Sequence, residues 1–468
     1  MEDVSETPLI ETHPKRFYVI RIITLIIVSL MYSLVTFHKF CPSIVAEEMA
    51  SAYGVTKSEL GVFSSIYFYP YAIMQPFAGL FADIFDPAIS LAVFSILASA
   101  GTALCGISKT ITVGMIGRFF VGLGTSPVYV SCLKIFSNWY RKESLPVLLG
   151  ILMSFSCFGG FLAGTPLSLF CRILGWRLAF YVIGGSSAFI SLIVLIFIRG
   201  SPEKKGFSPV NDNFILDQGS STFLDKMKLL YKNTIQIIPY KHFWVIAAYN
   251  LTAICPYFNI GGYWGGPFLN DVLGYTITET GSAMISISIG LLVGSLVLPH
   301  LGNLLKSKKF VLMMSSFLAT VPMVVLYLYG NKLSKFVIKI LYAIIGCFTA
   351  SLTTLDYPLL SSYYSPLISG SAVGIANFIL NIMVAAYQQG SGYVIPLFGV
   401  VPSESGVKNY TWNGYKNGLW LFMGISTFVS FLISIFIRDP ESRLCVIRPK
   451  RQFNNDDTLT SSIVSMDN

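Results

Sequence analysis

Long apolar runs separated by short polar loops dominate the pattern of this chain. Each run extends for about 20 residues or more, which is the length an α-helix needs to cross the hydrocarbon core of a bilayer. The pattern therefore predicts twelve transmembrane helices. Their predicted bounds are 17–40, 60–81, 87–107, 111–135, 145–170, 177–198, 242–268, 280–300, 309–330, 336–360, 368–398 and 415–437.

Three short sequences of the first six runs recur, in the same order, in the last six. A chain that repeats one membrane-embedded unit is typical of carriers built from two similar halves around a central path. We therefore expect an all-α membrane protein with twelve transmembrane helices in two six-helix pseudo-repeats. The recurring pairs are Gly54–Gly61 with Gly274–Gly281, Ser137–Tyr140 with Ser361–Tyr364, and Ile196–Arg199 with Ile435–Arg438.

The first recurring pair also carries a local structural signal. Thr56 precedes Glu59 by three residues, and Thr276 precedes Glu279 in the same way. This is the spacing of a capping box, in which a hydroxyl and a carboxylate bind free backbone N–H groups at the start of a helix. We expect both pairs to cap the helices that follow, and we favour this role for Glu279 over that of a proton carrier.

One loop is much longer than the others and divides the chain into two halves. This loop is rich in Lys and Ser and lies between the sixth and seventh apolar runs. The expected organisation is a cytoplasmic tail 1–16, an N-terminal half 17–198, a cytoplasmic linker 199–241, a C-terminal half 242–437 and a cytoplasmic tail 438–468.

Composition and charge agree with a multi-pass membrane protein. Hydrophobic residues make up 54% of the chain and charged residues only 12%, against roughly 25% charged residues in a soluble domain. Lys and Arg gather in alternate loops and in the tails, so the positive-inside rule places both termini in the cytoplasm. The sequon Asn409-Tyr410-Thr411 then falls in an outer loop. We expect a plasma membrane or an endolysosomal-type membrane as the location.

Several classes of function are excluded by what the sequence lacks. There is no Gly-rich phosphate loop, no cluster of metal ligands and no nucleophile paired with a base. The eight cysteines are scattered without a CxxC pair, which predicts buried free thiols. We therefore expect no enzyme activity, no cofactor and no metal, and the net charge of +9 reflects topology rather than binding of nucleic acid.

Short motifs make the chain similar to the major facilitator superfamily over about residues 17–440. Gly79 and Asp83 match the Gly-x-x-x-Asp start of its loop motif between helices 2 and 3, although the basic second half of that motif is missing. Arg118, Gly122 and Gly124 resemble the Arg-x-x-x-Gly-x-Gly signature of helix 4. The resemblance implies the major facilitator fold and transport by alternating access.

Within that superfamily the chain most resembles poorly characterised organic-solute permeases of prokaryotic type. The resemblance depends on three segments, Phe37–Lys39, Tyr67–Tyr71 and Gly262–Pro267. A lysosomal-type carrier of peptides or amino acids stays open as an alternative. The family likeness does not identify a substrate.

Three basic residues inside the predicted membrane helices of the N-terminal half are candidates for the transport path. A charge inside the membrane costs about 2.5–3.5 kcal/mol on insertion scales, so each one needs a reason. His38 and Lys39 lie on the first helix and Arg118 on the fourth. Structural alternatives stay open: Lys39 can extend to the outer interface, Arg118 can bind neighbouring backbone, and His38 can be a neutral, satisfied side chain.

The C-terminal half contributes polar candidates on its first and fifth helices. Helix 7 is broken by Pro256 and by several glycines, and Asn259 on it is the repeat counterpart of Lys39. These side chains either line the path or bridge neighbouring helices, and the sequence does not decide between the two. The candidates are Asn259, Tyr263, Trp264, Asn377, Asn381 and Gln388.

One pair of opposite charges predicts an inner gate. Lys134 on helix 4 and Asp356 on helix 10 lie at nearly the same predicted depth, on symmetry-related helices of opposite halves. We expect them to form an ion pair when the carrier opens outward. In the alternative reading, Lys134 extends to the inner interface while Asp356 caps a loop.

The sequence thus predicts a secondary active or facilitative transporter of a small polar organic solute, acting as a monomer in the lipid bilayer. Because few buried acids oppose the cations of the N-terminal half, we expect a substrate that bears a carboxylate. A coupling proton or cation is a further candidate partner, and uniport, symport and antiport all stay open. The alternative function is that of a transporter-like membrane sensor or scaffold without transport activity.

Overall fold

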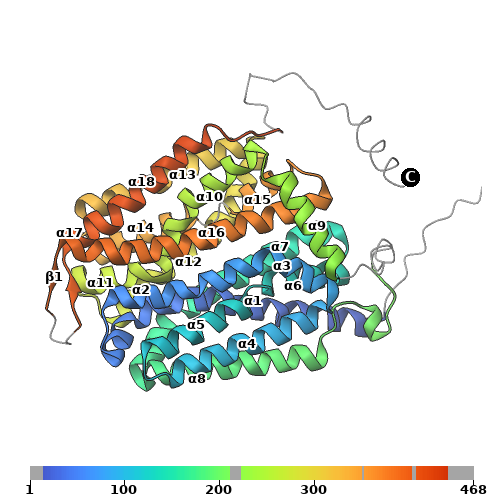
Figure 1. The fold of residues 1–468 in the computed structure, drawn as a ribbon, viewed down its shortest axis with the longest axis horizontal. Helices are drawn as coiled ribbons and strands as arrows, with labels where there is room; N and C mark the ends of the chain where they lie inside the picture. Colours follow the sequence, from blue (N-terminus) through green and yellow to red (C-terminus); the bar gives the residue numbers. More distant parts are fainter. Residues whose placement is uncertain (1–13, 211–222, 350–352, 403–406, 441–468) are drawn as a thin grey trace, which may run out of the picture.

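Long helices lie side by side in two groups, one formed by each half of the chain (Figure 1). The computed structural model describes residues 14–210, 223–349, 353–402 and 407–440. We call the end that carries Lys15 the inner end and the end that carries the short β-hairpin the outer end, following the predicted orientation. The inner end is on the right of Figure 1 and the outer end on the left.

The N-terminal group contains eight α-helices and occupies the lower half of Figure 1. They are α1 (Lys15–Tyr53), α2 (Lys57–Ile66), α3 (Phe68–Ile84), α4 (Pro87–Ile107), α5 (Ile111–Thr125), α6 (Val128–Trp139), α7 (Leu145–Leu162) and α8 (Thr165–Phe197).

The C-terminal group occupies the upper half of the same view, and α9 (Phe223–Ile237) crosses to it from the linker. Its elements are α10 (Lys241–Asn259), the π-helix η4 (Ile260–Trp264), α11 (Gly265–Leu273), α12 (Ile277–Leu304), α13 (Lys308–Tyr329), α14 (Lys335–Phe348), α15 (Thr353–Ser361), α16 (Pro366–Val394), β1 (Val400–Val401), β2 (Asn409–Tyr410), α17 (Trp412–Tyr415), the π-helix η7 (Lys416–Trp420) and α18 (Leu421–Ser434), with short 3-10 turns between some of them.

The predicted all-α membrane fold is confirmed, although several predicted helices are broken into pieces. Helix 2 divides into α2 and α3, helix 4 into α5 and α6, and helix 7 is interrupted by η4. Within α8, Gly175 has non-helical dihedral angles (φ 78°, ψ 155°) and turns the chain sharply between the predicted helices 5 and 6. Among the described residues, nine helical stretches are long and apolar enough to cross a membrane. One of them contains two predicted helices. Predicted helix 2 is not among them because it is divided, and predicted helix 10 includes residues 350–352, which lie outside the described part of the chain.

Both predicted capping boxes are present, and they give the two halves the same outer loop. The hydroxyls of Thr56 and Thr276 accept hydrogen bonds from the backbone N–H of Glu59 and Glu279, and each glutamate carboxylate accepts one in return. Before each box the chain turns through a glycine in the left-handed region, Gly54 and Gly274. The repeated sequence therefore produces a repeated structure, because the same groups meet the same free N–H donors.

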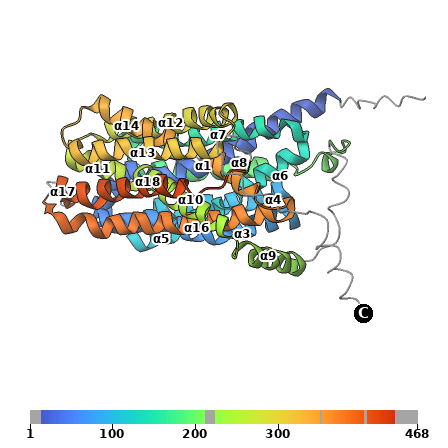
Figure 2. The same cartoon turned by 90° about the horizontal axis from the view of Figure 1, so that it is seen from above.

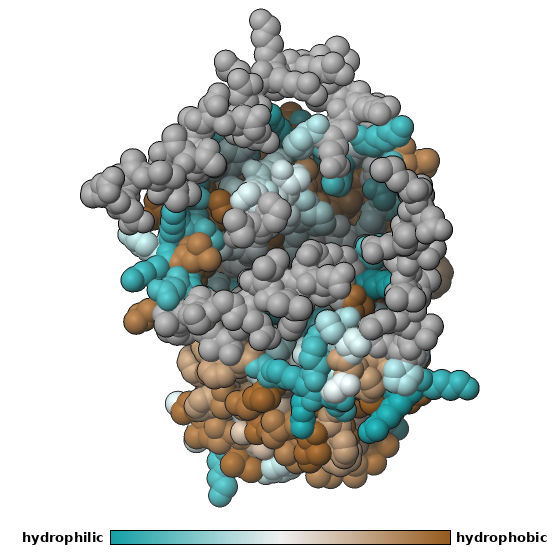
Figure 3. Space-filling model, turned by 90° about the vertical axis from the view of Figure 1, so that its right-hand side faces the viewer, coloured by the Kyte–Doolittle hydropathy of each residue, from teal (hydrophilic) through white to brown (hydrophobic). Residues whose placement is uncertain are grey.

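Large apolar side chains cover the outside of both groups, as expected for a surface that faces lipid. Ile173, Phe189 and Phe336 are among the most exposed of them. Seen along the molecule from its inner end, the sides are largely apolar, whereas hydrophilic side chains gather at the end itself (Figure 3). Figure 2 shows the same bundle from above, with α9 lying beside it near the inner end.

Glycines set how closely neighbouring helices approach. A Cβ added at Gly159 of α7 would lie 1.9 Å from the Ser33 carbonyl oxygen of α1. No atom lies within 4 Å of the corresponding position at Gly150, on the same helix. Contact between backbones at such small residues is the usual way in which helices pack inside a membrane.

This pair of glycines gives a direct test of the packing. Gly159→Ala should lower the thermal stability of the purified protein clearly, because the α7 backbone must move away from α1. Gly150→Ala should be neutral or slightly stabilising, since alanine favours the helix and meets nothing. The measurement is the melting temperature of both variants in detergent, and equal melting temperatures would contradict the packing.

Candidate functional site

The two halves are joined most tightly at the outer end. The Ser43 hydroxyl of α1 donates to the Tyr263 carbonyl oxygen (2.9 Å) and accepts from the Gly266 N–H (3.0 Å). A Cβ at Gly266 would lie only 1.9 Å from the Ser43 carbonyl oxygen. Close backbone contact and these hydrogen bonds together close the outer end around α1 and η4.

A buried ion pair lies in the same region and also joins the halves. The Lys57 ammonium of α2 binds the Asp271 carboxylate of α11, and the two side chains are only 1% and 0% exposed. The second carboxylate oxygen of Asp271 accepts from the Tyr415 hydroxyl (2.8 Å) and from the Tyr410 N–H (3.1 Å). A buried ion pair needs such additional hydrogen bonds to offset the loss of hydration.

The β-hairpin between α16 and α17 completes this network. The Asn409 side-chain oxygen accepts from the Lys57 ammonium (2.8 Å), and the Tyr410 hydroxyl binds the Ser58 hydroxyl (2.6 Å). The Tyr263 hydroxyl donates to the Lys57 carbonyl oxygen (2.5 Å). We call these residues, Lys57, Ser58, Tyr263, Asp271, Asn409, Tyr410 and Tyr415, the outer cluster.

The repeated outer loops explain why the two charges meet. Lys57 directly follows the capping residue Thr56, and Asp271 lies in the last turn of α11, just before Gly274. The capping boxes thus fix a cation at one helix start and an acid at one helix end, on opposite halves. Sequence reasoning missed Lys57 and Asp271, because charged residues at helix ends are usually solvated. The signal in the sequence was that the two residues carry opposite charges and lie at equivalent outer loops of opposite halves.

Lys39 lies one helical turn inward of Ser43, at the junction of the two groups. Its ammonium is 4.3 Å from the centre of the Tyr71 ring of α3 and 5.2 Å from the centre of the Phe258 ring of α10. Among the described residues, no carboxylate lies within ion-pair distance of Lys39. The aromatic faces attract the cation, but its charge is left without a neutralising partner.

Tyrosines from both halves surround the region next to Lys39. The Tyr32 and Tyr129 rings lie 5.5 Å apart in the N-terminal group. In the C-terminal group the Tyr357 hydroxyl donates to the Asn377 side-chain oxygen (2.5 Å), and Tyr357 lies close enough to Tyr71 and Tyr129 to interact electrostatically with both. Asn377, one of the predicted path residues, is therefore half-buried beside residues of the other half.

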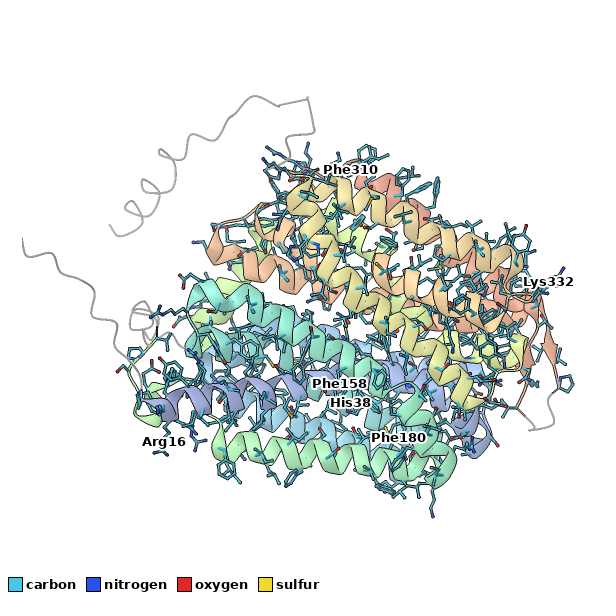
Figure 4. The ribbon with its side chains drawn as sticks, turned by 180° about the vertical axis from the view of Figure 1, so that it is seen from behind. Arg16, His38, Phe158, Phe180, Phe310 and Lys332 are labelled. Atoms are coloured by element: carbon cyan, nitrogen blue, oxygen red, sulfur yellow. The ribbon has the colours of Figure 1, made fainter. Side chains whose placement is uncertain are left out.

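The other two basic candidates face the interior of the N-terminal group. The Arg118 guanidinium donates to the carbonyl oxygen of His38 (2.8 Å) and, more weakly, to that of Ser64 (3.5 Å). It also lies 4.9 Å from the centre of the Tyr67 ring. His38 is buried within this group (Figure 4). Hydrogen bonds to neighbouring backbone are what the structural alternative predicts for Arg118. A transport role for Arg118 or His38 stays a prediction.

The remaining polar candidates make hydrogen bonds within the C-terminal group. The Asn259 amide donates to the Ser391 hydroxyl (2.9 Å), so it does not face the junction as its repeat counterpart Lys39 does. The Trp264 indole N–H donates to the Gln388 carbonyl oxygen (2.8 Å), and the Gln388 amide donates to the Phe258 carbonyl oxygen (3.0 Å). The Asn381 amide donates to the Asn377 carbonyl oxygen (2.8 Å). These contacts bridge or stabilise helices.

The structure does not test the predicted inner gate, because the outer end is closed in this conformation. One carboxylate oxygen of Asp356 accepts from the Tyr357 N–H (2.8 Å), and the side chain is buried. Lys134 is half-buried on α6. The predicted pair belongs to the outward-open state, so it stays a prediction.

Of the family loop motif, Gly79 lies on α3, whereas the Asp83 side chain is outside the described part of the structure.

Comparison with known proteins settles the family. The family model described as Major Facilitator Superfamily matches residues 23–388. This chain belongs to the Major Facilitator Superfamily. A bacterial homologue of the human lysosomal transporter Spinster, solved in an inward-facing and unoccupied conformation, has the same fold, with a TM-score of 0.68 over 91% of this chain and 98% of that chain at 16% identity.

Curated relatives match parts of this major facilitator chain. A probable sulfoacetate transporter of Cupriavidus necator is 30% identical over 178 residues, which cover 38% of this chain and 41% of the relative. A galacturonate transporter of Dickeya chrysanthemi is 27% identical over 266 residues, which cover 54% of this chain and 75% of that relative. The chain therefore spans less than half the length of the first of these two proteins.

The outer cluster predicts how the conformational equilibrium of this major facilitator protein responds to mutation. Lys57→Met leaves Asp271 buried without its partner, a change that typically costs about 3–5 kcal/mol, so the closed outer end should open. Spin labels at Ser51→Cys and Lys332→Cys, on the outer ends of opposite halves, should report longer distances by pulsed EPR in this variant.

The matched control uses a second ion pair, which lies within one half. Lys335 binds Glu279 at the outer end, but the side chains are 59% and 37% exposed. Because exposed pairs contribute only about 0–1 kcal/mol, Lys335→Met should leave the label distances unchanged. Unchanged distances in Lys57→Met as well would show that the buried pair does not hold the outer end closed.

Proposed function

We propose that this protein moves a small organic anion across the membrane by alternating access, and that Lys39 binds the anionic group. The observation that carries the proposal is the position of Lys39 at the junction of the two halves, between Tyr71 and Phe258, with no carboxylate partner among the described residues. A cation in a medium of low dielectric attracts an anion far more strongly than it does in water.

The surroundings of Lys39 suit a solute that carries hydroxyl groups as well as a charge. Tyr357 of the C-terminal half interacts electrostatically with Tyr71 of the N-terminal half, and its hydroxyl donates to the Asn377 side-chain oxygen. Aromatic faces and hydroxyl or amide groups are the usual partners of small polar ligands. Sulfoacetate and galacturonate, after which two relatives are named, are both organic anions, and this agreement supports the proposed charge of the substrate.

The closed outer cluster supports alternating access. Contacts near Lys39 come from both halves, so a bound solute would lie between two bodies that move relative to one another. The outer cluster closes this region on the outer side.

Uptake into proteoliposomes tests the charge of the substrate. Galacturonate and galactose have the same sugar ring and differ in the carboxylate, so they form a matched pair of probes, and a panel of small organic acids such as sulfoacetate extends the comparison. Acids should be taken up or should compete, whereas the neutral counterparts should not. Preference for neutral or cationic solutes would contradict the proposal, and a protein that moves no solute in the panel would favour a sensor or scaffold.

Substitution of Lys39 tests its role. Lys39→Gln should raise the KM for the transported acid by at least about tenfold, since an ion pair inside a protein contributes several times the ~1 kcal/mol of one in water. Lys39→Arg should retain part of the activity because it keeps the charge. Lys109→Gln, an exposed lysine at the outer end, serves as the control. Equal kinetics in Lys39→Gln and in this control would contradict the assignment.

The inner gate remains part of the proposal, and charge reversal tests it. Lys134→Asp and Asp356→Lys should each impair transport, because each places two like charges close together when the carrier opens outward. The double swap should restore part of the activity, since it restores opposite charges. A double variant no better than the worse single variant would show that the two residues do not pair.

A further inference from the structure

The helix α9 has one face that packs against the transmembrane bundle at its inner end. Asn233 and Ile237 are buried there, and the Asn233 amide donates to the Ser371 hydroxyl of α16 (3.1 Å). The helix also contacts α3. Because α3 belongs to the N-terminal half and α16 to the C-terminal half, α9 lies across the junction between the halves (Figure 1).

The opposite face of α9 is apolar and exposed. Three large side chains of the helix that lie on this face, and that of Ile238 directly after its end, are between 48% and 70% exposed. Their spacings of seven, four and three residues place them in one stripe along the helix. A stripe of this kind is unusual on a surface that faces water. The four residues, which we call the α9 stripe, are Leu224, Tyr231, Ile235 and Ile238.

Two exposed basic residues, Lys228 and Lys232, flank one side of the stripe, and Lys226 is half-buried nearer the packed face of the helix. An exposed tryptophan, Trp244, lies just beyond the end of α9 and donates its indole N–H to the Ile238 carbonyl oxygen (2.8 Å). Tryptophan is enriched at the interface between membrane and water, so this end of the stripe lies where the headgroups are expected.

We propose that α9 binds the inner surface of the membrane through anionic lipids. Its stripe would enter the boundary between headgroups and acyl chains, and its lysines would bind the acidic headgroups. An apolar face next to Lys residues is the pattern of helices that lie in the membrane interface, and each basic residue near an anionic surface contributes about 1 kcal/mol. A protein partner would also cover the stripe, but the flanking charge and the neighbouring lipid-facing helices favour lipid.

The proposal has a consequence for the carrier as a whole. Because α9 contacts α3 and α16 at once, lipid that holds α9 in the interface also restrains the inner ends of both halves. Anionic lipid would therefore influence the exchange between conformations, whichever solute is carried. The inference does not depend on the charge of the substrate or on the role of Lys39.

Site-directed spin labelling distinguishes lipid, water and protein as the neighbour of the stripe. Labels are placed at Tyr231→Cys, in the stripe, and at Gln236→Cys, on the polar side of α9, in a chain with Cys347 and Cys445 replaced by serine. The full-length protein is reconstituted in vesicles of phosphatidylcholine and phosphatidylglycerol in a ratio of 3:1. The label at 231 should collide mainly with lipid-soluble oxygen, and the label at 236 mainly with a water-soluble nickel complex.

Headgroup dependence is tested in vesicles of phosphatidylcholine alone. There, nickel collisions at position 231 should rise at least about twofold, and Lys226→Gln/Lys228→Gln/Lys232→Gln should cause the same rise in the mixed vesicles. The matched triple Lys332→Gln/Lys335→Gln/Lys339→Gln, at the outer end, should cause none. The proposal is overturned if the label at 231 is shielded from both reagents, since protein then covers the stripe, if it is open to nickel in both kinds of vesicle, or if its accessibility is the same in both.

Discussion

The ion pair between Lys57 and Asp271 joins the two halves of this protein at a point where both side chains are fully buried. Neither charge would be stable there alone, because removing a charge from water is costly unless a counter-charge and hydrogen bonds replace the lost hydration. Asn409, Tyr410 and Tyr415 provide those bonds. The closed outer end therefore depends on one neutralised pair, and the position of α2, α11 and the β-hairpin follows from it.

Lys39 differs from Lys57, because Lys39 makes no ion pair with a described carboxylate. In the outer cluster both charges have a partner, whereas the ammonium of Lys39, one turn inward of Ser43, lies between two aromatic rings. Arg118, which reads in the sequence as a similar buried cation, is held by carbonyl oxygens inside one half. Of the three basic candidates, Lys39 is thus the one whose surroundings come from both halves and leave its charge available.

The sequence predicted the features that depend on neighbouring residues and missed those that join residues far apart in the chain. The twelve helices and the capping boxes at Thr56 and Thr276 were predicted because apolar length and a three-residue spacing are local properties. The pairing of Lys57 with Asp271 was missed because it joins residues 214 positions apart. The repeat relation between Lys39 and Asn259 could not predict their contacts, since equivalent backbone positions in the two halves place their side chains beside different neighbours.

The π-helix η4 connects two regions of the structure. Phe258, which contacts Lys39, precedes η4 in the chain, and Asp271, which belongs to the outer cluster, follows it. A π turn contains one residue more than an α turn. If η4 changed to α-helical hydrogen bonding, α11 would rotate by about 100° and shift by about 1.5 Å relative to α10. A change of helical register at one glycine-rich turn would therefore withdraw Asp271 from Lys57 without unfolding either helix, and it would couple the surroundings of Lys39 to the closure of the outer end.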